Sequence, residues 1–243
     1  MLDFSSQDQA LFYEIFISKE YDFLDDTINQ SNKIVDIWWY IGFFSLYCFM
    51  IKSKYFYKYK DVSWKKINAF IRNMSQNFIN QENFSVDIYE PVKSYILKSQ
   101  KVLKHWKDNI TFYNCGIGKY NWFESIYLNN IKPMQTSMYD SFLLDSTNSI
   151  KNIKIKKLER TSSLSSNIDL LKMDIEWGEL DVLLNLKRKY FSKIRALAFE
   201  YHIINETFVA KLDKLIDRLS QIYPFKLHKP NSYSDRLGLY FFK

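Results

Sequence analysis

Residues 168–180, IDLLKMDIEWGEL, decide the fold class of this chain. A short apolar run ends at two carboxylates, Asp174 and Glu176, and a helical pattern begins directly after them. This order is typical of a strand that leads into a helix in an α/β protein. Ligands of open α/β sheets bind outside the carboxyl ends of the strands. Because alternate residues of a strand point to the same side, we expect both acids to face one cleft.

Strand and helix patterns alternate along most of the chain. Strands are expected at residues 34–38, 86–89, 110–114, 168–174, 194–202, 225–228 and 237–242, with an extra strand at 153–158. Helices are expected at residues 6–17, 43–52, 92–105, 179–190 and 206–222. The alternation predicts one α/β domain over residues 1–243, with a mostly parallel seven-stranded sheet flanked by helices.

Three segments lie outside this regular pattern. Residues 1–30 are expected to form an N-terminal helix and loop. Residues 53–84 mix aromatic and basic side chains at helical spacing, which predicts a helical insert after the first βα unit. Residues 120–150 are polar, aromatic and irregular, and we expect a substrate-shaping loop or a small hairpin there.

The composition describes a folded protein with a scattered positive charge. Of its 243 residues, 47% are hydrophobic and 18% are aromatic, which excludes a disordered chain. The net charge of +7 comes mainly from dispersed lysines, so a nucleic-acid partner is not favoured. The beginning of the chain lacks the features of a secretory signal, and Cys48 and Cys115 fit buried positions in a reducing compartment. We therefore expect a cytoplasmic protein.

One uncharged stretch, residues 37–51, calls for a comparison with membrane spans. A spanning helix needs about 20 apolar residues, and this stretch has only 15. It also contains Gly42 and Ser45, where a strand is expected to turn into a helix. A buried strand followed by a core helix is the better interpretation, so no transmembrane segment is predicted.

Six segments, taken in chain order, resemble the FkbM family of S-adenosylmethionine (SAM)-dependent methyltransferases. They are residues 10–21, residues 34–47 with IVD and GFFSLY, YEP at 89–91, ITFYNCGIG at 110–118, the Lys-x-Asp-x-Glu block at 172–176, and AFEYH at 198–202. Each segment alone is a weak signal, but the ordered set covers most of the chain. The resemblance implies a Rossmann-like methyltransferase fold, SAM as cofactor, and methyl transfer to a hydroxyl of a sugar, glycan or small metabolite.

The resemblance places Asp36, Gly42, Glu90, Asn114 and Asp174 around the cofactor. The ribose diol of SAM calls for an acid at the end of the second strand, because one carboxylate can accept both hydroxyl protons. Glu90 is the candidate for this role. The alternative is that Glu90 is a solvated acid at a helix start, where the helix dipole favours it.

Asp174, Glu176 and His202 are the candidate catalytic residues beside the acceptor. His202 could act as a base, because an imidazole titrates near neutrality, although it could also be a hydrogen-bonded core histidine. The two acids could instead cap the next helix. They could also contribute to a divalent-metal site, but two ligands are too few to establish one.

The first SAM motif departs from the family pattern. Relatives have Asp-x-Gly-x-x-x-Gly, whereas residues 36–42 read DIWWYIG, so that Trp38 stands at the first glycine. Each tryptophan carries about 150–250 Å² of surface, enough to fill the methionine part of the pocket unless it turns aside. An inactive member that serves as a binding or scaffold subunit is therefore the alternative to a SAM-dependent methyltransferase. An RNA methyltransferase, suggested by net charge alone, would bind RNA with a steep salt dependence.

Overall fold

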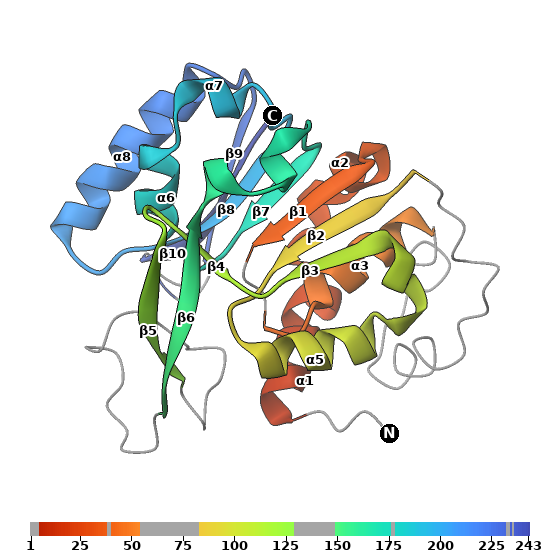
Figure 1. The fold of residues 1–243 in the computed structure, drawn as a ribbon. Helices are drawn as coiled ribbons and strands as arrows, with labels where there is room; N and C mark the ends of the chain where they lie inside the picture. The colour runs from red at the N-terminus through yellow and green to blue at the C-terminus, as the bar shows by residue number, and fades with distance from the viewer. Residues whose placement is uncertain are drawn as a thin grey trace.

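The computed structural model describes residues 5–37, 40–53, 83–128, 149–175, 178–231, 234 and 236–243. A seven-stranded sheet has the order β3-β2-β1-β7-β8-β10-β9, and a three-stranded sheet has the order β4-β6-β5. Figure 1 shows the small sheet projecting away from the large one at the edge where β3 leads into β4. The predicted α/β class, with a mostly parallel seven-stranded sheet flanked by helices, is confirmed.

The large sheet consists of β1 (Lys33–Ile37), β2 (Ser85–Tyr89), β3 (Ile110–Tyr113), β7 (Leu170–Met173), β8 (Leu197–His202), β9 (Lys226–Pro230) and β10 (Leu237–Phe242). The small sheet consists of β4 (Gly116–Gly118), β5 (Trp122–Leu128) and β6 (Ser149–Lys157). The α-helices of the described ranges are α1 (Ser6–Phe12), α2 (Asp25–Gln30), α3 (Phe43–Lys52), α5 (Lys93–Val102), α6 (Glu179–Asn185), α7 (Arg188–Phe191) and α8 (Glu206–Ser220).

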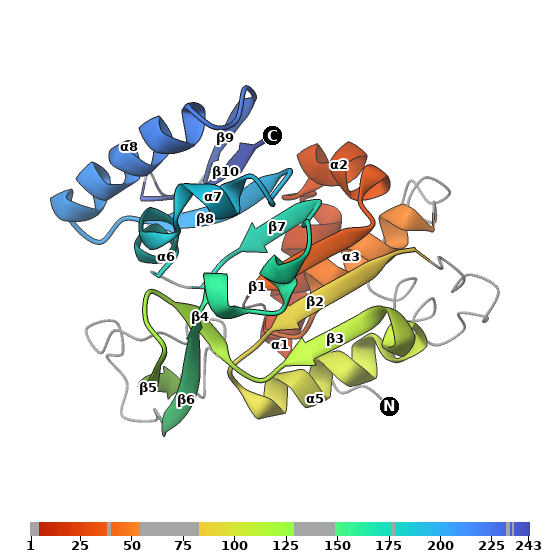
Figure 2. The ribbon, with the colours of Figure 1, turned by 45° about the horizontal axis from the view of Figure 1, so that its top comes forward.

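Chain direction explains how the layers form. Strands β3, β2, β1, β7 and β8 run parallel, and β10 runs antiparallel between β8 and β9. The chain moves from β1 toward β2 in one direction and from β7 toward β8 in the other, so right-handed crossovers place their helices on opposite faces. Helix α3 packs against α5, and α6 packs against α8. Figure 2 shows α5 alongside β3 at one end of the large sheet and α6 and α8 toward the other end.

Helix α3 was expected as a core helix, and the structure confirms this. All of its residues from Phe43 to Ile51 are buried. The two cysteines, Cys48 and Cys115, are buried free thiols, as predicted. In the part of the chain that the structure describes, no helix combines the length and the hydropathy needed to cross a bilayer.

Several predicted helix boundaries are wrong, because the helices end earlier than expected. Helix α5 begins at Lys93, and the predicted stretch to His105 ends instead at Val102, where a 3-10 segment takes over. The single helix predicted over 179–190 is two helices, α6 and α7. Their break follows from Arg218 of α8, whose guanidinium donates a 2.6 Å hydrogen bond to the Leu184 carbonyl and others to neighbouring carbonyls.

Other segments differ from the predictions in length. The helix predicted over 6–17 is α1 followed by a π-helical turn, Tyr13–Ile17. The extra strand, β6, is longer than expected and pairs antiparallel with β5. The loop or small hairpin predicted within 120–150 stays a prediction, because residues 129–148 lie outside the described ranges. The predicted insert at 53–84 falls almost wholly on residues 54–82, outside the described ranges. The single-domain prediction stays a prediction.

Candidate functional site

The carboxyl ends of β1, β2, β7 and β8 meet at one edge of the large sheet. Asp36 of β1 pairs with Ile88 of β2 on one side and with Lys172 of β7 on the other. Met173 pairs with Phe199 of β8, so that Asp174 follows beside Glu200. The structure therefore brings most of the sequence-predicted acids to a single edge, as expected for a parallel sheet.

Asp36 is completely buried beneath this edge. Its Oδ2 accepts a 2.7 Å hydrogen bond from the Ser45 hydroxyl at the start of α3, while its Oδ1 has no partner among the described residues. Burial raises the pKa of Asp36, and the nearby Lys172 ammonium opposes that shift. A buried carboxylate oxygen without a donor is costly, so Oδ1 calls for a hydrogen-bond donor that the described residues do not supply.

Glu90 follows β2 and is 1% exposed. Its Oε1 accepts a 2.7 Å hydrogen bond from the amide of Val92, the residue directly before α5. Its Oε2 is buried and has no partner within the described ranges. Burial raises the pKa of Glu90 well above its usual range. The alternative of a solvated helix-start acid is wrong, because the carboxylate is buried.

Asn114, at the end of β3, supports the Glu90 turn. Its side-chain amide donates hydrogen bonds of 3.1 Å to the Glu90 carbonyl and 2.8 Å to the Pro91 carbonyl. The amide nitrogen is thus engaged in holding the loop between β2 and α5. These contacts show that Asn114 stabilises the loop. They do not test its predicted place beside the cofactor.

Gly42 caps the N-terminus of α3 in a left-handed conformation, with φ of 75°. A Cβ at this position would lie 2.9 Å from Leu103 Cδ1 and 3.3 Å from Ser99 Cβ, both beside the end of α5. Glycine is therefore required by backbone conformation and by the close approach of α5. The predicted contact of Gly42 with the cofactor remains a prediction.

Lys172, the lysine of the Lys-x-Asp-x-Glu block, forms a buried ion pair with Asp174. It is 1% exposed, and its Nζ lies 3.1 Å from Asp174 Oδ2 and about 6 Å from the ring centres of Tyr21 and Phe44. Strand alternation puts Lys172 and Asp174 on the same side of β7. The buried ammonium therefore fixes one oxygen of Asp174 at the sheet edge.

Two further carboxylates from the N-terminal segment influence this ion pair. Burial raises the pKa of Glu14, and the charge of Asp174 adds to the effect. Burial also raises the pKa of Glu20 to about 8, with Glu14 and Asp174 adding to the shift and Lys229 and Lys172 opposing it. The raised pKa keeps Glu20 largely protonated at neutral pH, so it places little negative charge beside the Lys172–Asp174 pair.

Glu200 and His202 lie two residues apart on β8 and so face the same side as Asp174. One ligand atom from each of Asp174, Glu200 and His202 lies within 4.8 Å of the others. On its other side, His202 Nδ1 lies 3.7 Å from Glu179 Oε1. Glu179 is buried, and the same Oε1 accepts a 2.7 Å hydrogen bond from the Ile175 amide.

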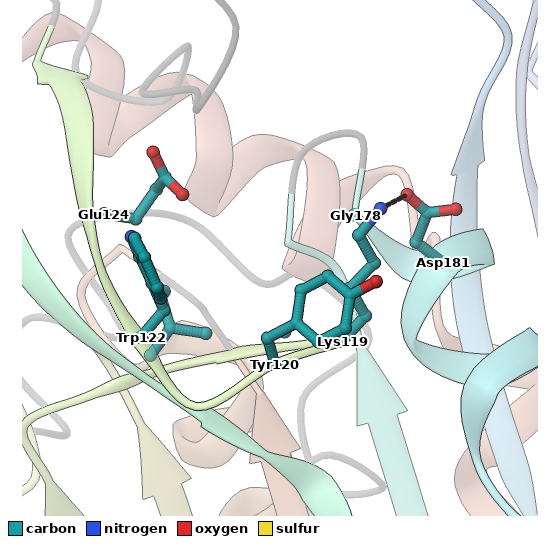
Figure 3. A pocket seen from close by; sticks show the side chains of 8 residues that line it. Lys119, Tyr120, Trp122, Glu124, Gly178 and Asp181 are labelled. Carbon is teal, nitrogen blue, oxygen red and sulfur yellow. Dashed lines mark hydrogen bonds and ion pairs between the residues drawn. The ribbon is translucent and has the colours of Figure 1, made fainter.

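A cavity of about 480 Å³ lies between the small sheet and the start of α6, at the same edge of the molecule. Figure 3 shows Trp122 and Glu124 on β5 across from Asp181 on α6, with Tyr120 and Lys119 below. Trp122 and Tyr120 are 67% and 62% exposed. The Lys119 ammonium lies 3.4 Å from Asp181 Oδ2. The cavity thus combines exposed aromatic faces with charged groups, as ligand sites do.

Part of the predicted site falls outside the described residues. Glu176, Trp38 and Trp39 belong to this part, so nothing is said of their positions. Of the predicted catalytic residues, Asp174 and His202 are brought together at the sheet edge. The sequence analysis gave Glu179 no role. A weak signal was present, because Glu179 is the first residue of a helix that closely follows an acid at the end of a strand.

The seven-stranded, mostly parallel sheet with flanking helices is a Rossmann-like fold of the methyltransferase type. A family model described as Methyltransferase FkbM domain matches residues 56–227. The match covers more than half of the sequence, and the chain therefore belongs to the FkbM methyltransferase family. No curated protein matches the chain.

Several solved structures resemble this chain at low sequence identity. An FkbM methyltransferase from Methylobacillus flagellatus KT is 17% identical with a TM-score of 0.51, and the match covers 99% of this chain and 56% of that one. A putative rRNA-methylase from Clostridium thermocellum is 9% identical, with a TM-score of 0.48 and coverage of 94% of each chain. A putative methyltransferase from Streptococcus mutans, solved with SAH, is 9% identical, with a TM-score of 0.46 and coverage of 91% and 96%. The chain thus spans little more than half the length of the Methylobacillus protein.

Proposed function

We propose that this protein transfers a methyl group from SAM to a hydroxyl of a saccharide or another small metabolite. The observation that carries the proposal is the buried Glu90 carboxylate, whose Oε2 has no partner within the described ranges. A ribose diol would supply the missing donors. The buried Asp36 Oδ1, which also lacks a donor among the described residues, fits the ammonium end of the same molecule.

When bound, SAM would supply a methyl group on a sulfonium, which is already a good leaving system. The protein then has mainly to align the acceptor oxygen with that methyl group and to exclude water. In this proposal Glu90 and Asp36 hold the cofactor, and Asn114 keeps the Glu90 loop in place. Asp174 and His202, with Glu176 from outside the described ranges, bind the acceptor hydroxyl and its proton.

The cavity beside α6 is the proposed acceptor site. The exposed rings of Trp122 and Tyr120 offer flat apolar surfaces to the C–H faces of a sugar. Glu124, Lys119 and Asp181 offer charged groups to its hydroxyls. A volume of about 480 Å³ lies within the usual range for small-molecule sites. Replacing Trp122 with Ala should raise the KM for the acceptor and leave SAM binding unchanged.

Calorimetric titration with SAM and with its demethylated product tests the proposal. Saturable one-to-one binding, followed by methyl transfer to a panel of hydroxylated saccharides, is the expected result. The absence of both heat and a thermal shift would overturn it and would favour the inactive alternative. In that case the double variant Trp38→Gly/Trp39→Ala should gain SAM binding, because the side chains that replace the small residues of the motif are removed.

A further inference from the structure

We infer that Asp174, Glu200 and His202 bind a divalent metal ion at the carboxyl edge of β7 and β8. The three residues come from two adjacent parallel strands, where Met173 pairs with Phe199 and places the next residue of β7 beside Glu200. Ligand atoms of the three side chains lie within 4.8 Å of one another. Neighbouring ligands of an ion at about 2.1 Å are roughly 3.0–3.4 Å apart, so the three side chains must draw together by up to about 1.8 Å to close on an ion.

The orientation of the histidine ring is an independent observation in favour of a metal. His202 Nδ1 faces the buried Glu179 Oε1 at 3.7 Å, and His202 Nε2 faces Glu200 Oε1 at 4.0 Å. Metal-binding histidines usually direct one ring nitrogen at the ion and the other at a carboxylate that fixes the tautomer. Glu179 fits the role of this carboxylate, because its Oε1 accepts a hydrogen bond from the Ile175 amide that holds it in place. Glu179 is therefore a positioning residue.

Lys172 is compatible with the ion because its contact with Asp174 is made to Oδ2. Its Nζ lies 3.1 Å from Oδ2, and a carboxylate can use its second oxygen for another partner. The side chain of Glu200 is 20% exposed, whereas that of His202 is 6% exposed, so the set is reached from solvent on the Glu200 side. The set itself contains two carboxylates, Asp174 and Glu200, against the single Lys172 ammonium, which offsets the repulsion between that ammonium and a cation.

The ligand set limits the kind of metal. One imidazole and two carboxylates suit Mn²⁺, Co²⁺ or Zn²⁺ better than Ca²⁺, which prefers six to eight oxygen ligands. Three protein ligands also leave coordination positions for an acceptor hydroxyl, and the ion would lower its pKa. This role rests on the proposed methyl transfer. It also changes the role of His202, because a histidine that binds metal through Nε2 does not take the hydroxyl proton.

The test is calorimetric titration of the EDTA-treated full chain with Mn²⁺, Co²⁺ and Zn²⁺. We expect one site per chain. His202→Gln and Glu200→Gln should each weaken binding by more than about 100-fold, and Glu179→Gln by about 10–100-fold. The matched controls His105→Gln, beside α5, and Glu206→Gln, on the exposed start of α8, should bind like the wild type.

Absence of saturable binding to the wild type, or undiminished binding to both His202→Gln and Glu200→Gln, would overturn the inference. Visible absorption of the Co²⁺-loaded wild type adds a measurement that needs no variant. A spectrum that differs from aqueous Co²⁺ supports the site, and an unchanged one overturns it. SAM binding is titrated separately in EDTA. If the protein binds SAM but no metal ion, the metal site is refuted and the proposed methyl transfer stands. If it binds a metal ion but not SAM, the proposed methyl transfer is refuted and the metal site stands.

Discussion

Replacing Glu90 with Gln should have opposite effects on cofactor binding and on stability. The substitution keeps the acceptor oxygen that receives the Val92 amide at 2.7 Å but removes the second acceptor, Oε2. A hydrogen bond to a charged group contributes about 1.5–3 kcal/mol, and each 1.4 kcal/mol is about tenfold in affinity. Loss of one ribose hydrogen bond should therefore weaken SAM binding by roughly 10–150-fold.

The unliganded protein should become more stable in the same variant. Glu90 is 1% exposed, and its Oε2 has no donor within the described ranges. A neutral amide costs less to bury than a carboxylate, so we expect a gain of about 1–2 kcal/mol in the free energy of unfolding. For a chain of this size the gain corresponds to a rise in Tm of about 2–8 °C. It should be larger at high pH, because the raised pKa of Glu90 means that protonation removes the charge at low pH.

Both effects can be measured on one preparation, by calorimetric titration with SAM and by thermal unfolding without it. Glu206→Gln is the matched control, because this exposed glutamate lies on α8 away from the sheet edge, and it should change neither quantity appreciably. If Glu90→Gln destabilised the protein and bound SAM like the wild type, Glu90 would be a structural carboxylate of the α5 start. The reasoning that makes it the ribose ligand would then be refuted.

Three further substitutions test the site and its supports. Gly42→Ala should cost about 1–3 kcal/mol in chemical denaturation, because φ is 75° and the new Cβ would lie 2.9 Å from Leu103 Cδ1; a loss below about 0.5 kcal/mol would contradict this. Lys172→Met should cost about 3–5 kcal/mol by leaving the Asp174 carboxylate without its ammonium, and an unchanged Tm would show that the pair is dispensable. Burial raises the pKa of Glu20 to about 8, so the folded chain keeps a proton that the unfolded chain releases near 4.5, and stability should fall as pH rises between these values. Glu20→Gln should flatten that decline in a series of thermal unfolding curves, whereas a persisting slope would assign it to other groups.

Sequence reasoning located most elements because their apolar patterns are local. The run before Asp174 and the fully buried residues of α3 are recognisable without knowing their neighbours. The ends of elements were less predictable. The break between α6 and α7 depends on Arg218, which donates to carbonyls about 35 residues earlier in the chain. No local pattern around residue 186 contains that contact.

The candidate site likewise has features that the sequence predicted and features that it did not. Glu90 and Asp174 were predictable, because each follows an apolar strand and parallel strands bring such residues to one edge. Asp36, inside β1, was proposed from the resemblance to the first SAM motif. The buried state of Glu90 was not predictable, since it depends on how α5 and β3 close around the turn. The cavity between β5 and α6 likewise required strand β5 to be placed beside a helix that is distant in sequence.

By itself, the sequence determined the α/β class, the FkbM family and the strand ends that carry acids, because hydrophobic periodicity and short motifs are properties of neighbouring residues. Only the tertiary structure decided which of those acids are buried, which one Lys172 holds, and that Asp174, Glu200 and His202 meet. The physical reason is strand order. Residues 174 and 200 become neighbours only because β7 and β8 are hydrogen-bonded, and Glu179 faces His202 only because α6 folds back over that edge.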